Sequence, residues 1–521
     1  MDDALVDLLR EDLERAEYSA AGVRALLGVA ADDARARGVF APARRVLDEH
    51  GGSPFGTLIR LFLLGEALAE EDLAAALPSL GAAGAMRLGL LAEGTDGFRA
   101  ALSLNPVELP DPAGETGAIA SWWILSDLDD QLRRGPARPD HVMGVGGATR
   151  SLIAQAPLGP GTEPPGSVLD LGTGCGVVAL HLARAGARRV VATDISGRAL
   201  SLARANARLN GLGGRIDFRS GDLFAPVAGE RFDLILSNPP FVITPRGDDS
   251  VPRYEYRDGG MRGDELAARV VREAPALLNP GGTLLCLANW ETPWGGRGLA
   301  RVGEWIEAGA EGLGGEGSLA GWAIERELLD PARYAETWAR DGGARPGEAG
   351  FEALMEAWLR EFADRRVVSI GLGSVRILRS AAGETPAIRL EHVDGPLARE
   401  PGPGLAAAFA AGIAAEGMSD AEILAVHWVR DEAVAELREH APGEEGPRSI
   451  ALRTERPIAR TVVADPLLAA AVGACDGELS LAQIADALAT LLEVDAEAAA
   501  EALVAGFREL VWFGMLRAPV E

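Results

Sequence analysis

The strongest constraint on the fold is a series of four short apolar segments between residues 167 and 241, each followed by glycine or polar residues. The first segment, residues 168–171, leads into glycines at positions 172, 174 and 176 and then into an apolar pattern with helical spacing. Glycines in such a turn let the backbone approach a bound molecule closely. Alternating strands and helices predict a doubly wound α/β fold, with its site at the carboxyl ends of the strands.

Two classes of ligand use a glycine turn of this kind, dinucleotides and S-adenosylmethionine. The spacing Asp170-x-Gly172-x-Gly174-x-Gly176 differs from the Gly-x-Gly-x-x-Gly fingerprint of dinucleotide sites. Asp194 ends the second segment roughly 20 residues after the turn, where a carboxylate accepts hydrogen bonds from ribose hydroxyls in both classes. The third segment leads to Asp222, which is placed to hold an adenine amino group. These three features leave both ligand classes open.

The fourth segment decides between them. Residues 233–237 run into Asn238-Pro239-Pro240-Phe241, which resembles the motif of class I methyltransferases that act on planar nitrogens. A planar nitrogen must pyramidalise to accept a methyl group, and two hydrogen-bond acceptors stabilise that change. The resemblance implies that the Asn238 side-chain oxygen and the Pro239 carbonyl are these acceptors. Pro240 then stiffens the turn and Phe241 stacks on the planar group. The alternative is a plain turn that contains two prolines.

One set of candidate site residues follows. The catalytic candidates are Asn238, Pro239, Pro240 and Phe241, and the candidate contacts to S-adenosylmethionine are Asp170, Gly172, Thr173, Gly174, Gly176, Asp194, Ile195, Asp222, Leu223 and Asn238. A second glycine-rich stretch, residues 142–149, precedes the first segment, and Thr149 or Arg150 is a candidate contact for the cofactor's carboxylate. The three cysteines lie far apart in the sequence, so no metal site is expected.

Composition and charge argue against several other classes of function. The formal net charge of -27 argues against a strong, non-specific grip on nucleic acid, although a local basic face stays open. The chain contains no lysine, so it has no Walker A loop, and no His-Glu-x-x-His motif occurs. The first residues lack a basic and apolar leader, and no run of 18 apolar residues occurs, so we expect a cytoplasmic protein without membrane contact.

The 521 residues suggest three units, on a prior of about 100 to 200 residues per domain. Residues 1–110 predict a helical or winged-helix-like domain. It would begin with solvent-facing helices and continue with three further helices and a hairpin. The alternative is a plain helical cap on the catalytic domain. Residues 111–400 predict the catalytic domain, with later strands, a helix at 265–278 and a helical insert near 351–362. Residues 401–521 predict a small helical or winged-helix-like domain for packing or interaction, with a hairpin and two helices.

Residues 168–288 resemble the release-factor glutamine N5-methyltransferase family. The resemblance lies in the glycine turn, Asp194, Asp222, the Asn-Pro-Pro-Phe tetrapeptide with the Val-Ile-Thr-Pro that follows it, and the loop Gly259-Gly260-x-x-Gly263. That family usually has tyrosine at the position of Phe241, and its bacterial members have a shorter helical N-terminal domain and no tail. Phenylalanine there is more similar to ribosomal RNA guanine-N2 or adenine-N6 methyltransferases.

The resemblance implies an S-adenosylmethionine-dependent N-methyltransferase with a macromolecular acceptor. Charge and family together favour a glutamine side-chain amide in a release-factor-like protein, and the alternative is an exocyclic amine of adenine or guanine in ribosomal RNA or another nucleic acid. A third reading is a non-catalytic binding protein, in which a methyltransferase fold is a scaffold between two winged helices. The intact Asp194 and Asn238 argue against that reading.

Overall fold

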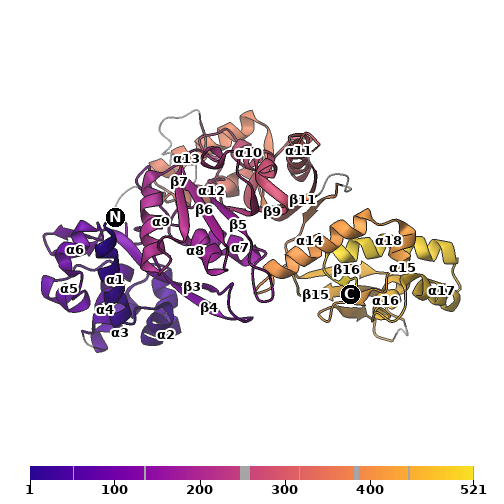
Figure 1. Cartoon of the computed structure of the whole chain (residues 1–521), viewed down its shortest axis with the longest axis horizontal. Helices are drawn as coiled ribbons and strands as arrows, with labels where there is room; N and C mark the ends of the chain where they lie inside the picture. Colours follow the sequence, from indigo (N-terminus) through magenta and orange to yellow (C-terminus); the bar gives the residue numbers. More distant parts are fainter. Residues whose placement is uncertain are drawn as a thin grey trace.

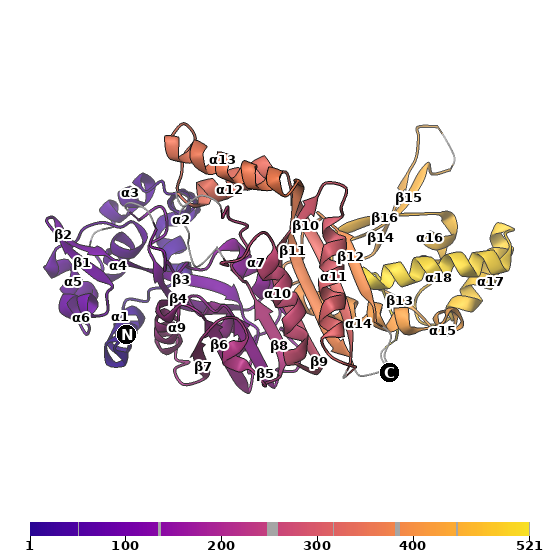
Figure 2. The ribbon, with the colours of Figure 1, turned by 90° about the horizontal axis from the view of Figure 1, so that it is seen from above.

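A computed structural model describes residues 1–50, 52–133, 137–246, 259–315, 317–380, 386–443 and 446–519 of the chain. The molecule is elongated, with N-terminal helices at one end, a central α/β body, and a smaller group of helices and strands at the C-terminal end (Figure 1, Figure 2). No helix among these described residues is long and apolar enough to cross a membrane.

The central body is an eight-stranded mixed sheet with the order β12-β10-β11-β9-β8-β5-β6-β7. Five neighbouring strands from β9 to β7 are parallel, and β11 is antiparallel to both β9 and β10. The strands are β5 (Ser167–Leu171), β6 (Arg189–Asp194), β7 (Ile216–Ser220), β8 (Phe232–Ser237), β9 (Leu278–Pro293), β10 (Ser318–Leu329), β11 (Val367–Ser380) and β12 (Ile388–His392). This sheet confirms the predicted mixed α/β, Rossmann-like fold.

Helices bury both faces of this sheet. Alternate residues of a strand point to opposite faces, and in β8 Leu234 and Leu236 pack in the cluster that contains α8 (Val177–Arg184) and α9 (Gly197–Leu209). Ile235 packs in the cluster that contains α10 (Glu265–Glu273) and α11 (Gly298–Glu311). Because both faces are buried, the parallel strands are nearly continuous apolar runs, which is why the sequence revealed them.

The direction of strand addition reverses between β5 and β8. Strands β6 and β7 lie on one side of β5, and β8 and β9 lie on the other. The pairing runs from Val168 opposite Leu234 to Leu171 opposite Ser237, so the loops that begin at residues 172 and 238 leave the same edge side by side. In open α/β sheets this switch point forms the ligand crevice.

The N-terminal region is helical and is fastened to the sheet through α9. Its elements are α1 (Asp3–Arg15), α2 (Ala20–Ala36), α3 (Ala41–Glu49), α4 (Pro54–Leu63), α5 (Glu70–Ala76), α6 (Gly81–Arg87), β1 (Leu91–Gly94), β2 (Gly97–Ala100), β3 (Leu102–Pro110) and β4 (Ile119–Asp127). Asn206 and Asn210 of α9 exchange side-chain hydrogen bonds with the backbone of Leu125 and Trp123 in β4. Helices α4 to α6 and the β1–β2 hairpin follow the predicted order, and the winged-helix interpretation stays a prediction.

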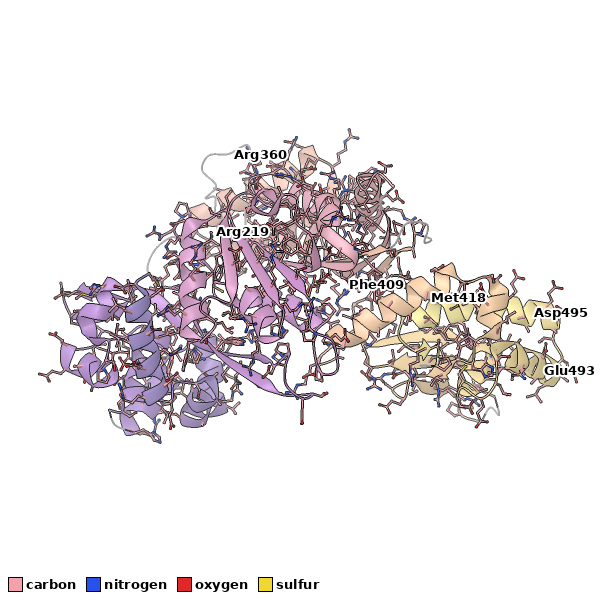
Figure 3. All side chains as sticks on the ribbon, viewed as in Figure 1. Arg219, Arg360, Phe409, Met418, Glu493 and Asp495 are labelled. Carbon is pink, nitrogen blue, oxygen red and sulfur yellow. The ribbon has the colours of Figure 1, made fainter. Side chains whose placement is uncertain are left out.

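The C-terminal region packs on the far edge of the sheet. Its elements are α14 (Gly402–Gly417), α15 (Asp420–Ala425), β13 (Val429–Arg430), β14 (Ala435–Glu439), β15 (Ser449–Thr454), β16 (Arg460–Ala464), α16 (Pro466–Gly473), α17 (Leu481–Leu492), α18 (Ala496–Trp512) and β17 (Leu516–Arg517). Phe409 of α14 (Figure 3) and Trp512 of α18 pack against Trp322 of β10. The predicted hairpin is β15 and β16, and the two predicted helices are α17 and α18.

Several details of the catalytic region differ from the expectation. Residues 367–380 form one long strand, β11, in which Gly371 and Gly373 lie close to atoms of β9 and β10. A Cβ at Gly371 would lie 2.2 Å from Trp290 Nε1, and one at Gly373 would lie 2.0 Å from the Ile324 carbonyl oxygen. The predicted helix 265–278 ends at Glu273 and continues as a short 3₁₀ turn, Ala274–Leu277. The helical insert contains two helices, α12 (Pro331–Asp341) and α13 (Ala349–Asp364).

Candidate functional site

The glycine turn after β5 presents backbone to open space. Gly172, Gly174 and Gly176 have φ values of 77°, 54° and 89°, in the left-handed region that favours glycine. A Cβ added at Gly172 or Gly174 would have no heavy atom within 4 Å, whereas one at Gly176 would lie 2.9 Å from the Ala203 Cβ of α9. The first two glycines therefore leave room for a ligand, and the third allows α8 and α9 to pack closely.

Asp194 lies at the end of β6, across from this turn. Its Oδ2 accepts a hydrogen bond from the Gly174 N–H at 2.9 Å, and its Oδ1 accepts one from the Ser196 N–H at 2.8 Å. These two bonds fix the orientation of the carboxylate, whose two oxygens together offer about four lone-pair sites. The next residue, Ile195, is 64% exposed. The open turn, the carboxylate and an exposed apolar side chain thus lie together.

Asp170 and Thr173 lie inside the turn. The Asp170 carboxylate is buried, and it accepts hydrogen bonds from Thr173 Oγ1 at 2.6 Å and from the Ala179 N–H at 3.0 Å. Burial raises the pKa of Asp170 to about 7, and the negative charge of Asp194 adds to the effect. In the structure both side chains shape the turn, and their predicted contact with a cofactor stays a prediction.

The raised pKa makes the stability of this turn depend on pH. The Asp170 carboxyl group stabilises the fold at a pH below its unfolded value of 3.8, and this contribution is lost as the pH rises through about 7. In Asp170→Asn the loss is absent. The free energy of unfolding of Asp170→Asn, measured relative to that of the wild type, should therefore increase by at most about 4 kcal/mol between pH 4 and pH 8. Urea unfolding of both proteins across this range checks the shift, and a constant difference would contradict it.

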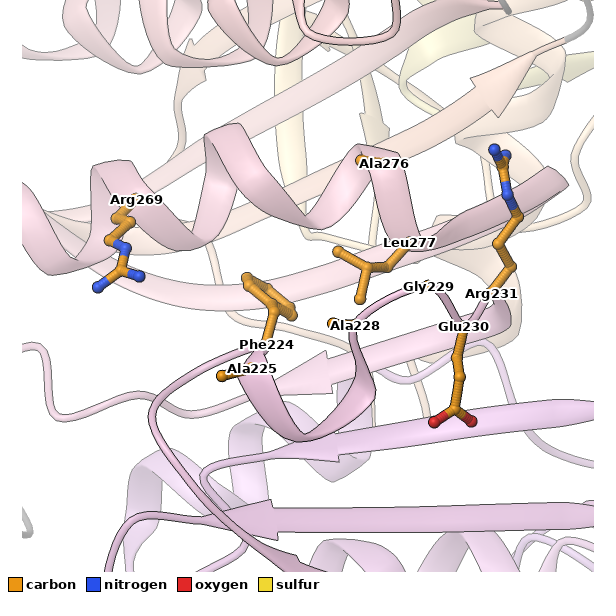
Figure 4. Close-up of a pocket in the computed structure, with 9 residues that line it drawn as sticks. All are labelled: Phe224, Ala225, Ala228, Gly229, Glu230, Arg231, Arg269, Ala276 and Leu277. Atoms are coloured by element: carbon orange, nitrogen blue, oxygen red, sulfur yellow. The ribbon is translucent and has the colours of Figure 1, made fainter.

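Asp222 and Leu223 follow β7 at the same edge. The Gly221 N–H donates to the Asp194 carbonyl at 3.1 Å, which ties the end of β7 to the end of β6. The Asp222 carboxylate is 59% exposed and forms an ion pair with Arg269 of α10 at 3.3 Å. An open cavity of about 460 Å³ lies beside it, with Phe224, Ala228 and Leu277 between Arg269 at one end and Glu230 with Arg231 at the other (Figure 4).

Asn238 follows β8 and has an unusual side-chain environment. Its Nδ2 donates to Thr149 Oγ1 of α7 (Gly147–Gln155) at 3.1 Å. Its Oδ1 is buried, and no group in the part of the chain that the structure describes donates a hydrogen bond to it. An acceptor left in this state costs about 1–3 kcal/mol. Thr149 thus orients the amide so that its oxygen stays available, a contact that the sequence did not reveal.

The other three residues of the tetrapeptide follow Asn238 and are at least partly buried. Pro239 is buried, and Pro240 and Phe241 are half-buried. The Phe241 ring packs edge-to-face on Trp338 of α12, with 6.4 Å between ring centroids and 69° between ring planes. Trp338 was not predicted as a site residue, although its spacing of four from Tyr334 places both aromatic side chains on one face of a helix.

The sequence also singled out Arg150 and the glycine-rich loop at residues 259–263. The Arg150 side chain of α7 donates to the Glu108 carbonyl of β3 at 2.9 Å, and its predicted contact with the cofactor stays a prediction. Of the loop that contains Gly259, Gly260 and Gly263, the structure describes these three residues, while Arg257 and Asp258 lie outside the described residues. A Cβ at Gly263 would lie 3.2 Å from Glu291 Oε2 at the end of β9, so this part of the loop packs against the sheet.

Comparison with known proteins finds family matches for two parts of the chain. Residues 148–296 match the family described as Methyltransferase small domain, and residues 15–101 match a Domain of unknown function (DUF7059). The chain is 37% identical over 182 residues to the ribosomal RNA small subunit methyltransferase C of Alcanivorax borkumensis, which covers 35% of this chain and 50% of that protein. It is 43% identical over 131 residues to the release factor glutamine methyltransferase of Cereibacter sphaeroides, which covers 24% and 46%.

The chain therefore spans about half the length of the curated relatives it matches. Among solved structures, the ribosomal protein L11 methylase of Lactobacillus delbrueckii subsp. bulgaricus matches with 19% identity and a TM-score of 0.25, over 46% of this chain and 81% of that one. The matched segment contains the glycine turn, Asp194, Asp222 and Asn238. Residues 148–296 thus match the methyltransferase small domain family, and relatives that share this segment are named as methyltransferases.

Proposed function

We propose that this chain is an N-methyltransferase that transfers a methyl group to a planar nitrogen, the side-chain amide of a glutamine in a protein acceptor. The observation that carries the proposal is the buried Asn238 Oδ1, which accepts no hydrogen bond from the described residues. A buried acceptor without a donor destabilises the fold. Such an atom at the switch point of an α/β sheet is accounted for if a hydrogen of the substrate binds to it.

The strand ends fit S-adenosylmethionine. The open face of the turn at Gly172 and Gly174 has room for the cofactor, and the fixed Asp194 carboxylate has lone pairs for its ribose hydroxyls. Asp222 is exposed at the next strand end, where we assign it to the adenine amino group. When bound, S-adenosylmethionine would supply an electrophilic methyl carbon on a sulfonium; the C–S bond would break as the N–C bond forms, and the surplus proton of the methylated nitrogen would pass to water.

The protein's own part in the reaction is to prepare the nitrogen. The lone pair of an amide nitrogen is delocalised, so the nitrogen becomes a better nucleophile as it pyramidalises. Asn238 Oδ1 and the Pro239 carbonyl accept the two N–H groups and stabilise that change. Phe241 holds the plane of the amide, and Thr149 keeps the Asn238 amide from rotating. We assign the catalytic role to residues 238–241 on these grounds.

Two kinds of acceptor fit a planar-nitrogen site. Relatives of the matched segment are named as methyltransferases of release factors and of ribosomal RNA. The net charge of -27 opposes the approach of a phosphate backbone, whereas a loop of a folded protein needs only a local fit. We therefore favour a glutamine in a release-factor-like protein. Phe241, in place of tyrosine, favours the second candidate, an exocyclic amine of adenine or guanine in ribosomal RNA.

We also propose the division into residues 1–110, 111–400 and 401–521. The middle unit holds the candidate site, and the outer units are assigned to acceptor binding or packing. In support, the N-terminal and C-terminal regions pack at opposite ends of the catalytic sheet (Figure 1).

The acceptor is testable with labelled cofactor. Wild-type protein is incubated with ribosomal, tRNA and soluble-protein fractions, and the label is expected in a protein as a methylated glutamine. Transfer to protein should depend weakly on salt, whereas transfer to RNA should fall steeply as salt rises, because phosphate contacts release counterions. Label that resists protease and digests to a methylated adenine or guanine would establish the second candidate instead. Label in no fraction would contradict the proposed function.

A further inference from the structure

The loop that follows the tetrapeptide is held by two side chains from the helical insert. Tyr334 of α12 is fully buried, and its hydroxyl oxygen accepts hydrogen bonds from the Ile243 N–H at 3.0 Å and from Asn289 Nδ2 of β9 at 2.9 Å. Trp358 of α13 is also buried, and its Nε1 donates to the Ile243 carbonyl at 2.7 Å. Both backbone polar groups of Ile243 are therefore fixed by the insert.

The same insert fastens the end of this loop. The Arg246 N–H donates to Glu361 Oε2 of α13 at 2.5 Å. The Arg246 guanidinium donates to the Met261 carbonyl at 3.0 Å and 2.8 Å, which joins the loop to the glycine-rich segment before α10. Glu361 in turn pairs with Arg365 at the end of α13. Two loops that border the site thus depend on α13.

The insert also supplies an aromatic side chain beside Phe241. Trp338 lies one helical turn after Tyr334, packs edge-to-face on Phe241, and is partly exposed. Its neighbours Tyr334, Trp358 and Phe362 belong to one buried cluster with Ile243. This cluster keeps α12 and α13 against the loop, so the position of Trp338 relative to Phe241 is set by packing.

The sheet itself does not need this insert. Strands β10 and β11 are antiparallel neighbours that pair from Ser318 opposite Ser380 to Leu329 opposite Ile370. A turn of about two residues is enough to join such strands. Residues 330–366 intervene instead, and in Figure 2 α12 and α13 project from the end of β10 and β11. Tyr334, Trp358 and Glu361 of the insert contact the loop beside the candidate site, which points to a role there.

We propose that the α12–α13 insert is the element that positions the methyl acceptor. Tyr334 and Trp358 are positioning residues, because they fix the loop that carries Phe241. Trp338 is a specificity residue that completes, with Phe241, an aromatic wall against the planar amide of the acceptor. This inference rests on the proposed N-methyltransferase function and extends it to residues outside the matched segment, which ends at residue 296.

The positioning step is tested without any acceptor. Tyr334→Phe removes the oxygen that accepts the Ile243 N–H, so hydrogen exchange of that amide should accelerate at least about tenfold, which corresponds to the loss of roughly one hydrogen bond. The matched control is Tyr18→Phe, since the hydroxyl of this equally buried tyrosine donates to the Leu104 carbonyl in the N-terminal region. An Ile243 amide that exchanges equally in Tyr334→Phe and in Tyr18→Phe would overturn the positioning role.

The specificity step is tested by methyl transfer. The probes are ribosomal and soluble-protein fractions from cells that lack the gene, titrated into the enzyme with labelled cofactor. In Trp338→Ala the half-saturating amount of the active fraction should rise about tenfold or more, while the affinity for S-adenosylmethionine by calorimetry stays within about twofold. Arg360→Ala on the exposed face of α13 (Figure 3) should change neither quantity.

The two experiments separate this inference from the proposed function. If the wild-type protein labels no fraction, the proposed function fails, and hydrogen exchange still decides whether Tyr334 positions the loop. If the wild-type protein is active and Trp338→Ala leaves the half-saturating amount unchanged, the specificity role is wrong. If Trp338→Ala weakens cofactor and acceptor binding equally, the insert supports the fold as a whole, which also overturns the proposal.

Discussion

Replacement of Asn238 by alanine should lower the rate of methyl transfer about 10²- to 10³-fold, the usual cost of removing one oriented acceptor or donor that acts in the transition state. The affinity for S-adenosylmethionine should change little, because the proposed partner of Asn238 Oδ1 is the acceptor nitrogen. This oxygen is buried and accepts no hydrogen bond from the described residues, so the side-chain hydrogen bond that the substitution removes there is the one that Asn238 Nδ2 donates to Thr149 Oγ1. Single-turnover transfer with labelled cofactor, together with calorimetry of cofactor binding, checks both halves of the prediction.

Thr149→Val is the matched control for this variant. It removes the hydroxyl that accepts from Asn238 Nδ2 at 3.1 Å and keeps the acceptor oxygen. The amide then rotates more freely, so the rate should fall by less than in Asn238→Ala, about tenfold. A near-normal rate in Asn238→Ala would remove the planar-nitrogen mechanism, and a larger loss in Thr149→Val would show that Thr149 acts directly.

The central sheet and the strand-end residues were predictable from the sequence for a physical reason. Parallel strands buried on both faces are continuous apolar runs, and ligands of such sheets bind where those runs end. Gly172, Asp194 and Asn238 each lie at a strand end or one residue beyond it, so the order of strands along the chain was enough to predict that they share one edge of the sheet. Burial of the Asp170 carboxylate was not predictable, since the same spacing fits an aspartate that faces the ligand.

The contacts of the α12–α13 insert could not be predicted from the sequence, for a different reason. Tyr334 and Trp358 contact Ile243 across 91 and 115 residues of chain, and no local pattern encodes contacts of that range. Gly371 and Gly373 of β11 are likewise explained only by long-range contacts, since a Cβ at these positions would meet Trp290 and the Ile324 carbonyl. Sequence reasoning therefore placed the candidate residues at the strand ends and did not predict the contacts of the helices that pack beside them.

Asp194→Ala should weaken the binding of S-adenosylmethionine by at least tenfold, because each hydrogen bond to a charged acceptor contributes about 1.5–3 kcal/mol. The glycine turn is expected to loosen as well, since Asp194 also accepts from the Gly174 N–H at 2.9 Å and the Ser196 N–H at 2.8 Å. Asp194→Asn separates these effects. It keeps one acceptor oxygen and loses the charge, so its affinity should lie between those of wild type and Asp194→Ala. Calorimetry with S-adenosylmethionine and with S-adenosylhomocysteine measures all three proteins, and an unchanged affinity in Asp194→Ala would refute the assignment of this carboxylate to the ribose.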